Sequence, residues 1–308
     1  MSFNVNTSKG MLHYCDNHTG KMHGMMSLST SVVKNPYCQK RQNIPLSVCA
    51  KCFSESMHEQ YTDLAKWTAI NYDTLNGAVI PVNEFPLLNV SFFRDESFGD
   101  SASINHGLNM VNQCLRNPVT TFACWTKQFT IWDAVFHMVE KPENLIMVAS
   151  SPIVNRPLSE QILVKYPWIN HIFTVFTADF ALENDITIQC GLSRCLNCLQ
   201  CYRKDTPVFI NEVLKNEQPY YYRARYAKNK MKIRKTPVVS VSPSEIAFFQ
   251  GGKYHFYKVT TDPKYSYKIN KKSVSESTGN AEKVAEYINN NAFALDSLMT
   301  GRTFKKDV

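Results

Sequence analysis

Seven of the ten cysteines fall into two groups whose spacing suits metal ligation. The first group is Cys38, Cys49 and Cys52, spaced C-x10-C-x2-C, with Phe53 directly after the last cysteine. Three thiolates in one loop can hold three irons of a [4Fe-4S] cluster and leave the fourth iron open to a substrate or cofactor atom. The alternative is a structural zinc site completed by a histidine or a distant cysteine. The spacing indicates a metal without choosing between zinc and iron–sulfur.

The second group is Cys190, Cys195, Cys198 and Cys201. Its last three members form C-x2-C-x2-C, as bacterial ferredoxin-type loops do, whereas zinc knuckles separate two C-x2-C pairs by a longer loop. Four thiolates can close a cluster completely, so this group predicts an electron-transferring or structural [4Fe-4S] cluster. A four-thiolate zinc site that holds the end of the body together is the alternative.

The remaining cysteines, Cys15, Cys114 and Cys124, have no close partners in the sequence, and we expect small buried residues there. All ten cysteines lie in residues 1–202. The first residues lack a basic segment followed by an apolar one, and no apolar run is long enough to span a membrane. Thiols in such a chain predict a reducing compartment, the cytoplasm, and no membrane partner.

Charge divides the chain unevenly. Of its 308 residues 44% are apolar, which is ample for a sizeable core, and its net charge is +8. Residues 203–308 carry 20 Lys and Arg against 10 Asp and Glu, so the part before them is slightly acidic. We therefore expect a cysteine-bearing core over residues 1–216 and a basic, aromatic-rich region over residues 217–308.

Short apolar runs alternate with segments of helical spacing. The sequence predicts strands over residues 27–33, 87–93, 119–125, 145–149 and 172–176, and helices over 54–75, 104–115 and 131–139, with a further helix led by residues 157–160. Near-continuous β-branched strands between helices indicate an α/β fold with a mostly parallel sheet. Such sheets place their chemistry at the carboxyl ends of the strands.

The pattern changes after Cys201. We expect a helix over residues 207–215, strand-like alternation of tyrosine and lysine over 254–267, and a short helix over 280–290, an α+β arrangement. Seven basic residues without an acid among them lie between: Arg223, Arg225, Lys228, Lys230, Lys232, Arg234 and Lys235. They suit a surface that neutralises phosphates beside stacking rings, so nucleic acid is a candidate partner. Solvated edge strands with ordinary aromatic packing are the alternative.

An ordered set of segments resembles the phage gene-product-88-like protein family. The segments are Gly20-Lys21-Met22-His23-Gly24, Ser27-Leu28-Ser29-Thr30-Ser31, Asn35-Pro36-Tyr37-Cys38-Gln39-Lys40, Val48-Cys49-Ala50-Lys51-Cys52-Phe53, Phe93-Arg94, Ser97-Phe98-Gly99-Asp100 and Phe122-Ala123-Cys124-Trp125-Thr126-Lys127, closed by the second cysteine group. The resemblance covers residues 20–216. This chain has Phe53 where the family usually has tyrosine, and Asp100 where it has an acid such as glutamate.

The resemblance implies a distant relation to the radical S-adenosylmethionine enzymes and a partial (β/α) barrel. In those enzymes three loop cysteines hold the cluster, and a turn after the next strand holds the methionyl amine of the cofactor. It implies that Gly99, Asp100 and Ser150 bind the cofactor and that Arg94, Asp100 and Lys127 are catalytic. Ser151, Thr177 and Asp179 are further polar residues expected at strand ends in the same mouth. The cysteine spacing departs from the usual C-x3-C-x2-C.

These features predict an iron–sulfur protein with one or two [4Fe-4S] clusters and radical S-adenosylmethionine-like chemistry on an unidentified substrate, such as a nucleic acid or nucleotide. The alternative is a non-enzymatic protein, stabilised by zinc or iron–sulfur, that binds nucleic acid or a host component. Zinc at Cys190, Cys195, Cys198 and Cys201 belongs to that alternative. The resemblance places the protein in the cytoplasm of a bacterial host or a phage-infected cell.

Overall fold

Eight strands of the computed structural model form one sheet whose spatial order equals their order in the chain. They are β1 (Phe3–Thr7), β2 (Gly10–Cys15), β3 (Met26–Leu28), β4 (Phe92–Asp95), β5 (Thr121–Thr126), β6 (Leu145–Ser150), β7 (His171–Phe176) and β8 (Phe209–Val213). The first three pair antiparallel, and β3 to β8 pair parallel, each with the next. The predicted α/β fold with a mostly parallel sheet is confirmed.

The structure describes residues 2–191, 193–204 and 208–234, followed by β9 (Val238–Val241), β10 (Glu245–Gln250), β11 (Lys253–Lys258), β12 (Ser266–Ile269) and β13 (Lys272–Ser275). Side chains are described as far as residue 226. The chain divides into two units, Met1–Gln218 and Pro219–Val308, and the sheet of β1 to β8 belongs to the first. The second holds a three-stranded antiparallel sheet, β11-β10-β9, and the hairpin β12–β13. The helix expected over residues 280–290 lies outside the described residues.

Helices of the first unit alternate with the parallel strands. They are α1 (Pro36–Gln42), α2 (Phe53–Gln60), α3 (Thr62–Gly77), α4 (Ile104–Arg116), α5 (Phe129–Met138), α6 (Gln161–Lys165), α7 (Ala178–Glu183) and α8 (Cys195–Cys198), with single turns η1 (Gly20–Met22), η2 (Val48–Lys51), η3 (Val82–Glu84) and η4 (Gln200–Tyr202). The long helix α9 (Gln218–Arg234) follows β8. The helix expected over 54–75 is two helices, because the backbone is extended at Tyr61.

The helix predicted over residues 207–215 is wrong, because this segment is β8. Phe209, Ile210 and Val213 recur at intervals that suit either a helix or a strand. The exposed edge of β7 decides the outcome, since Phe209 to Val213 pair with Ile172 to Phe176 and satisfy that edge. The strand expected over 87–93 begins only at Phe92, and the one expected over 27–33 is the short β3.

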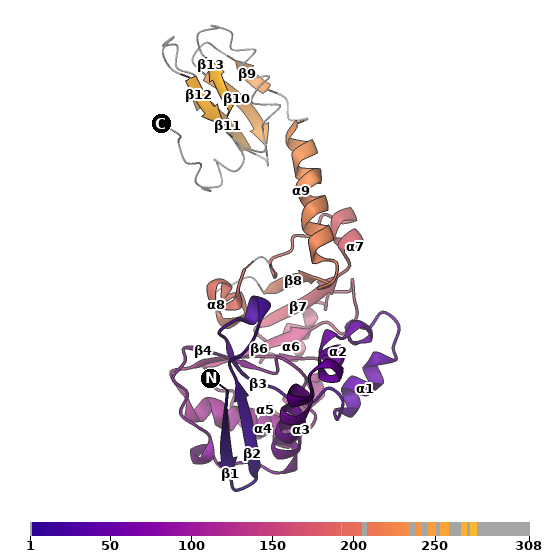
Figure 1. Ribbon diagram of the computed structural model, residues 1–308, viewed down its shortest axis with the longest axis vertical. Helices are drawn as coiled ribbons and strands as arrows, with labels where there is room; N and C mark the ends of the chain where they lie inside the picture. Colours follow the sequence, from indigo (N-terminus) through magenta and orange to yellow (C-terminus); the bar gives the residue numbers. More distant parts are fainter. Residues whose placement is uncertain are drawn as a thin grey trace. The chain divides into compact units, whose positions relative to one another are not determined.

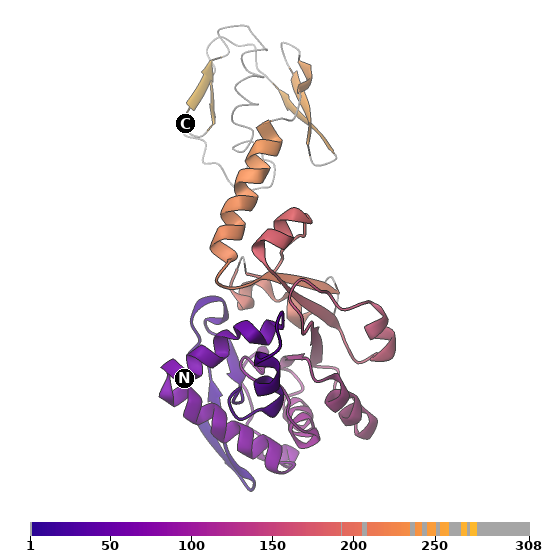
Figure 2. The same cartoon turned by 90° about the vertical axis from the view of Figure 1, so that its right-hand side faces the viewer.

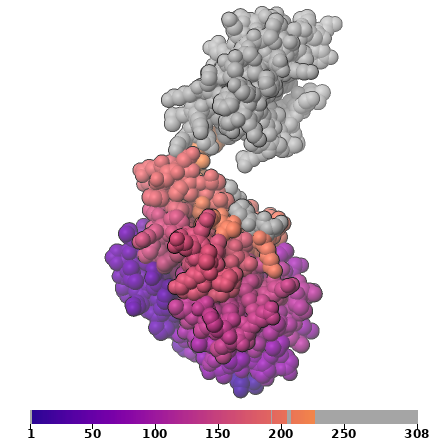
Figure 3. Space-filling model, turned by 180° about the vertical axis from the view of Figure 1, so that it is seen from behind, coloured from indigo at the N-terminus to yellow at the C-terminus, as the bar shows by residue number. Residues whose placement is uncertain are grey.

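The two faces of the sheet differ. Register places Phe93, Phe122 and Leu145 on one face and Arg94, Ala123 and Ile146 on the other. The first face packs under α3, α4 and α5, where Leu75, Met110, Val111, Trp132 and Val135 complete the main core. These three helices, purple to magenta, lie next to one another in both ribbon views (Figures 1 and 2). From behind, the coloured atoms form one continuous body (Figure 3).

The other face carries the cysteine-rich segments instead of a helical layer. Ala123 and Ile146 pack with Met25 and Tyr202, and Val148, Phe173 and Ile210 form a cluster that Cys190 and Cys201 touch. Farther along the strands, this face opens into a cavity.

A buried carboxyl at the end of β4 predicts a pH-dependent stability. Asp95 is fully buried; its Oδ1 accepts from Gln113 Nε2 at 3.1 Å, and its Oδ2 has no hydrogen bond within the described part of the chain. Burial, with the nearby charge of Glu96, raises the pKa of Asp95 well above its ordinary value. The folded state therefore holds this proton to higher pH than the unfolded chain, and stability falls as pH rises above the unfolded pKa of about 4.

We expect Asp95→Asn to shrink the difference in unfolding free energy between pH 5 and pH 8, measured by urea denaturation, because it removes the group whose pKa is raised in the folded state. The amide removes the ionisable group and keeps an oxygen for Gln113. Asp63→Asn, at an exposed position in α3, is the control and should leave the difference unchanged. An Asp95→Asn protein with the native pH dependence would contradict this account.

Candidate metal and cofactor site

One cavity of about 460 Å³ lies at the carboxyl ends of the parallel strands. Its lining includes every member of both cysteine groups together with the residues expected to bind the cofactor or act in catalysis: Cys38, Cys49, Cys52, Cys190, Cys195, Cys198, Cys201, Arg94, Gly99, Asp100, Lys127 and Ser150. Segments more than 100 residues apart in the sequence thus meet in one site. A volume of this size suits a small-molecule ligand.

The loop after β3 carries the first cysteine group. Asn35 caps α1 by accepting from the Tyr37 amide at 3.0 Å, and α1 buries Cys38. The hydroxyl of Ser47 accepts from the Cys49 amide at 3.1 Å at the start of η2, and Cys52 precedes α2. Each cysteine therefore lies in or next to a helical turn that a capping side chain or a backbone hydrogen bond stabilises.

The same loop is fastened to the segment after β6. The Val48 amide donates to the Pro152 carbonyl at 3.1 Å, and the Val154 amide donates to the Leu46 carbonyl at 2.9 Å. Arg41 also donates to the Pro152 carbonyl, at 3.0 Å. These bonds fix the first cysteine group against the far part of the parallel sheet.

The second cysteine group lies in two short turns after α7. The Cys190 amide donates to the Asn211 carbonyl of β8 at 3.0 Å, which holds this end of the segment on the sheet. Cys195 and Cys198 begin and end α8, Leu199 is left-handed with φ 54°, and Cys201 lies in η4. The left-handed residue reverses the chain so that Cys201 returns toward the cavity.

The thiols of each group influence one another. Burial and then the charges of Asp100 and Cys49 raise the pKa of Cys38 far above its ordinary value. Burial and the carboxylate of Glu212 raise the pKa of Cys190 to about 11, and burial with Cys190 raises that of Cys201 further. Thiols so placed need a cation to become thiolates, and a bound metal supplies that charge.

The described residues contain no group of three or more His, Cys, Asp and Glu side chains arranged to hold a metal ion. The seven thiols therefore line one cavity without surrounding a single ion.

The turn after β4 is held by dense polar contacts. Glu96, left-handed at φ 56°, accepts from the Thr30 hydroxyl at 2.8 Å and lies 2.9 Å from His106 Nε2. Asp100 Oδ1 accepts from the Ser101 amide at 2.9 Å and the Thr126 hydroxyl at 2.8 Å, and its Oδ2 accepts from the Lys127 amide at 2.8 Å. Burial raises the pKa of Asp100 to about 6 despite the positive charge of Lys127.

Gly99 makes this turn possible. Its φ is +88°, and a Cβ there would lie 2.6 Å from Glu96 Oε2 and 2.8 Å from the Thr30 carbonyl oxygen. An L side chain at this position is strained by its backbone and obstructed by its neighbours. The turn can therefore approach β3 closely only with glycine at this position.

Some polar residues expected in the mouth serve the fold instead. Ser151 is buried, does not line the cavity, and donates to the Ile153 carbonyl at 3.1 Å. Thr177 caps α7 and pairs with Asn155, and Asp179 lies in the first turn of that helix. Ser150 is the one serine of the expected pair that lines the cavity.

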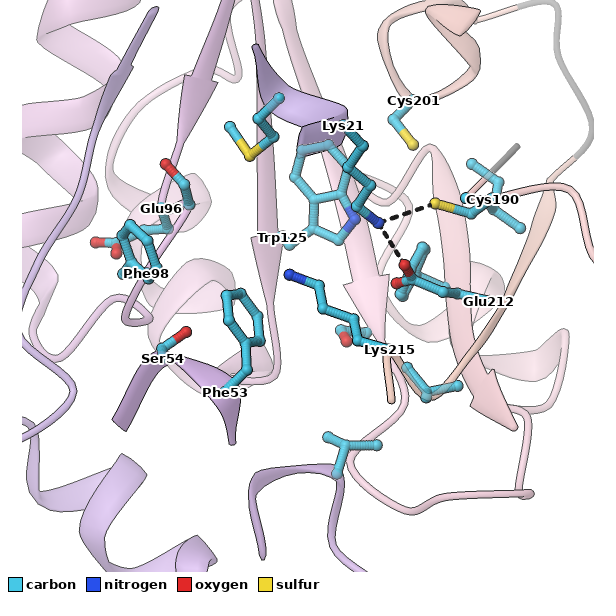
Figure 4. Close-up of a pocket in the computed structure, with 18 of the residues that line it drawn as sticks. Lys21, Phe53, Ser54, Glu96, Phe98, Trp125, Cys190, Cys201, Glu212 and Lys215 are labelled. Carbon is cyan, nitrogen blue, oxygen red and sulfur yellow. Dashed lines mark hydrogen bonds and ion pairs between the residues drawn. The ribbon is translucent and has the colours of Figure 1, made fainter. Parts of the chain in front are cut away.

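Five charged side chains beyond the predicted site residues also line the cavity: Lys21, Lys51, Glu96, Glu212 and Lys215. Lys21 Nζ forms an ion pair with Glu212 and donates to Cys190 Sγ at 3.3 Å (Figure 4). Lys215 Nζ lies 3.1 Å from the centre of the Phe53 ring. Loss of solvent around its amine, with the charge of Lys21, lowers the pKa of Lys215 to about 8.

Arg94 points to the same space from β4. Its guanidinium carbon lies 3.1 Å from the centre of the Trp125 ring, so the two groups are stacked. Its Nε is buried and forms no hydrogen bond with the residues that the structure describes.

The three remaining cysteines, Cys15, Cys114 and Cys124, do not line the cavity. Cys114 and Cys124 are fully buried in the main core, as expected, and Cys15 is partly buried at the end of β2. Arg223 and Arg225 lie on α9; the side chains of Lys228, Lys230, Lys232 and Arg234, and all of Lys235, lie outside the described residues. No described helix combines the length and apolarity needed to cross a bilayer.

Comparisons of the chain with models of protein families, with curated proteins and with solved structures return no match. The site is therefore interpreted from its own residues and geometry.

Gly99→Ala tests the turn. We expect the free energy of unfolding to fall by about 2 kcal/mol, because backbone strain of about 1–2 kcal/mol adds to the close contacts with Thr30 and Glu96. Urea denaturation measures the change. Gly77→Ala, where an added Cβ would meet no atom within 4 Å, is the matched control and should change stability by less. Equal effects of the two substitutions would show that the turn does not depend on glycine.

Proposed function

We propose that this protein is an iron–sulfur enzyme that uses S-adenosylmethionine for radical chemistry in the cavity above β3 to β8. The observation that carries the proposal is the convergence of both cysteine groups with Arg94, Gly99, Asp100 and Lys127 around one cavity. Nothing in the local sequence requires cysteines near residues 38 and 201 to meet, so their meeting favours a shared chemical task.

The strand order supports a partial (β/α) barrel as the frame of the site. Six consecutive parallel strands lie side by side in chain order, each joined to the next by a crossover connection, and helices cover one face while the cavity opens on the other. In such a frame the loops after the strands surround the active site. The first cysteine group follows β3 and the Gly99 turn follows β4, which is the order that the family resemblance implies.

The donor set suits an iron–sulfur cluster with one open iron. The three thiols Cys38, Cys49 and Cys52 come from one loop and line the cavity. No described histidine lines it, so a zinc ion at this loop would need a cysteine of the second group as its fourth ligand. When bound, such a cluster supplies an electron that splits the sulfonium of S-adenosylmethionine and starts radical chemistry on the substrate.

Asp100 suits the ammonium group of the cofactor. A carboxylate has about four acceptor positions, and the Ser101, Thr126 and Lys127 donors use three. The remaining position on Oδ2 can accept a charge-assisted hydrogen bond. The three donors also hold Asp100 in place, and Gly99 beside it lets the turn pack closely against Thr30 and Glu96.

Aromatic side chains suit the exclusion of water that radical chemistry needs. Phe53 and Phe98 line the side of the first cysteine group, with ring centres 6.0 Å apart, and Trp125 lines the floor from β5. An apolar wall beside the reacting carbon keeps solvent from quenching the radical and confines the substrate.

Replacing cluster ligands tests the proposal. We expect Cys38→Ala, Cys49→Ala and Cys52→Ala each to lower reductive cleavage of S-adenosylmethionine to the assay background, because each removes a ligand that no other thiol of that loop replaces. Detection of 5′-deoxyadenosine and methionine under dithionite measures cleavage. Cys15→Ala, a thiol outside the cavity, should retain the native rate. Full cleavage by a first-group variant would exclude the proposed cluster.

Metal analysis separates iron–sulfur from zinc in each group. We expect anaerobically purified protein to be brown, with absorption near about 400 nm and iron and sulfide in equal amounts. Cys195→Ala or Cys198→Ala should remove part of the iron without abolishing cleavage if the second group holds its own cluster. Colourless protein that contains only zinc would favour the alternative, a metal-stabilised protein without this activity that binds nucleic acid through its basic region.

A further inference from the structure

Basic side chains outnumber carboxylates in the lining of the cavity. Five basic residues line the cavity, Lys21, Lys51, Arg94, Lys127 and Lys215, against three carboxylates, Glu96, Asp100 and Glu212. Each carboxylate is already engaged: Glu96 with Thr30 and His106, Asp100 with backbone and hydroxyl donors, and Glu212 with Lys21. The protein therefore neutralises only some of the cations.

Among the described residues Lys21 is the one of these five basic side chains that forms an ion pair, and Arg94 and Lys215 are two of the four that do not. Within the described part of the chain neither forms a hydrogen bond or ion pair through its side chain, and Arg94 Nε is buried. Each instead lies against a ring, Arg94 on Trp125 and Lys215 on Phe53, at 3.1 Å from the ring centre. Stacking holds the charged groups in position but leaves their N–H donors unused.

The two groups approach the same space from opposite strands. Arg94 comes from β4 and Lys215 from the segment after β8, and the charge of Arg94 contributes to the environment of Lys215. Figure 4 shows the Lys215 amine pointing between Trp125 and Phe53. An unpaired guanidinium and an unpaired ammonium converge on a cavity that has no free carboxylate.

We propose that Arg94 and Lys215 bind an oxyanion group, a carboxylate or a phosphate, of a small-molecule substrate. The guanidinium edge can donate two parallel hydrogen bonds to such a group, and the ammonium adds a point charge from the other side. Glu212 holds Lys21 away from this role by pairing with it. That the bound anion is the substrate rests on the proposed function; the anion site itself does not.

Titration calorimetry on the anaerobically purified full chain tests the site, with pyrophosphate and malonate as probes at low salt. We expect at least one probe to bind, and Lys215→Gln and Arg94→Gln each to weaken its affinity by about tenfold or more. Arg94→Lys keeps the charge but loses the paired donors, so its affinity should fall between those of the native and Arg94→Gln proteins. Binding of pyrophosphate alone identifies a phosphate ester as the substrate class, and binding of malonate alone a carboxylate.

Lys66→Gln is the matched control. Lys66 is an exposed lysine that also lies over a ring, 4.7 Å from the centre of Trp67, but outside the cavity. Its loss should leave probe affinity within about twofold, because it changes net charge without touching the site. Thermal melting of every variant checks folding, and Lys215→Gln, in the segment after β8, retains a test if Arg94→Gln does not fold.

Several outcomes would overturn the inference. The first is that neither probe binds, and the second is that Lys66→Gln and Lys215→Gln lose equal affinity. The third is that the Arg94 and Lys215 variants keep native probe affinity but lose bound iron, which would show that these two residues balance the charge of a metal–thiolate group. Cleavage of S-adenosylmethionine distinguishes the two proposals. Anion binding without cleavage would support the anion site and contradict the proposed enzyme activity. Cleavage without anion binding would support the enzyme activity and contradict the anion site.

Discussion

Parallel pairing of six consecutive strands is the constraint on which the rest of the structure depends. Because β3 to β8 run in the same direction and in chain order, their carboxyl ends meet at one edge, and every loop that follows a strand faces the same space. The alternation of side chains along each strand then separates the roles of neighbours. Phe93 supports the helical core, whereas Arg94 faces the cavity.

Burial of charge accompanies this arrangement, and the protein handles it in three ways. Asp100 is surrounded by donors, Glu96 is matched with a histidine, and Glu212 is paired with Lys21. Arg94 and Lys215 are treated differently, since aromatic rings support them without satisfying their donors. A folded protein retains unused donors in a cavity at a cost in stability, which favours a role in binding over one in folding.

Much of the fold could be predicted from the sequence, and the reasons are physical. Leu145 to Ser150 is buried on both faces, so its apolar run indicates a central strand without ambiguity. The hairpin β1–β2 was not expected, because its polar residues Asn4, Asn6 and His13 hide a partly buried alternation. β8 was mistaken for a helix because its spacing fits both periods, and only the free edge of β7 decides between them.

The site residues at the ends of predicted strands could be predicted from the sequence, whereas those that come from segments remote in the sequence could not. The placement of Asp100 and Lys127 follows from strands that the sequence reveals. Lys21 precedes β3, and Glu212 and Lys215 depend on β8, so their place in the cavity required the sheet itself. Glu96 is an acidic residue directly after a strand, so the sequence contained the information needed to predict it as a site residue.

The hydrogen bonds between the first cysteine loop and the segment after β6 explain why ten residues separate Cys38 from Cys49. Residues 41–48 are the part of the loop that crosses to Pro152 and is bound there. An interval of three residues would leave no chain to make that crossing. The unusual spacing therefore lets the loop bind the segment after β6, so the position of the three cysteines depends on where that strand ends.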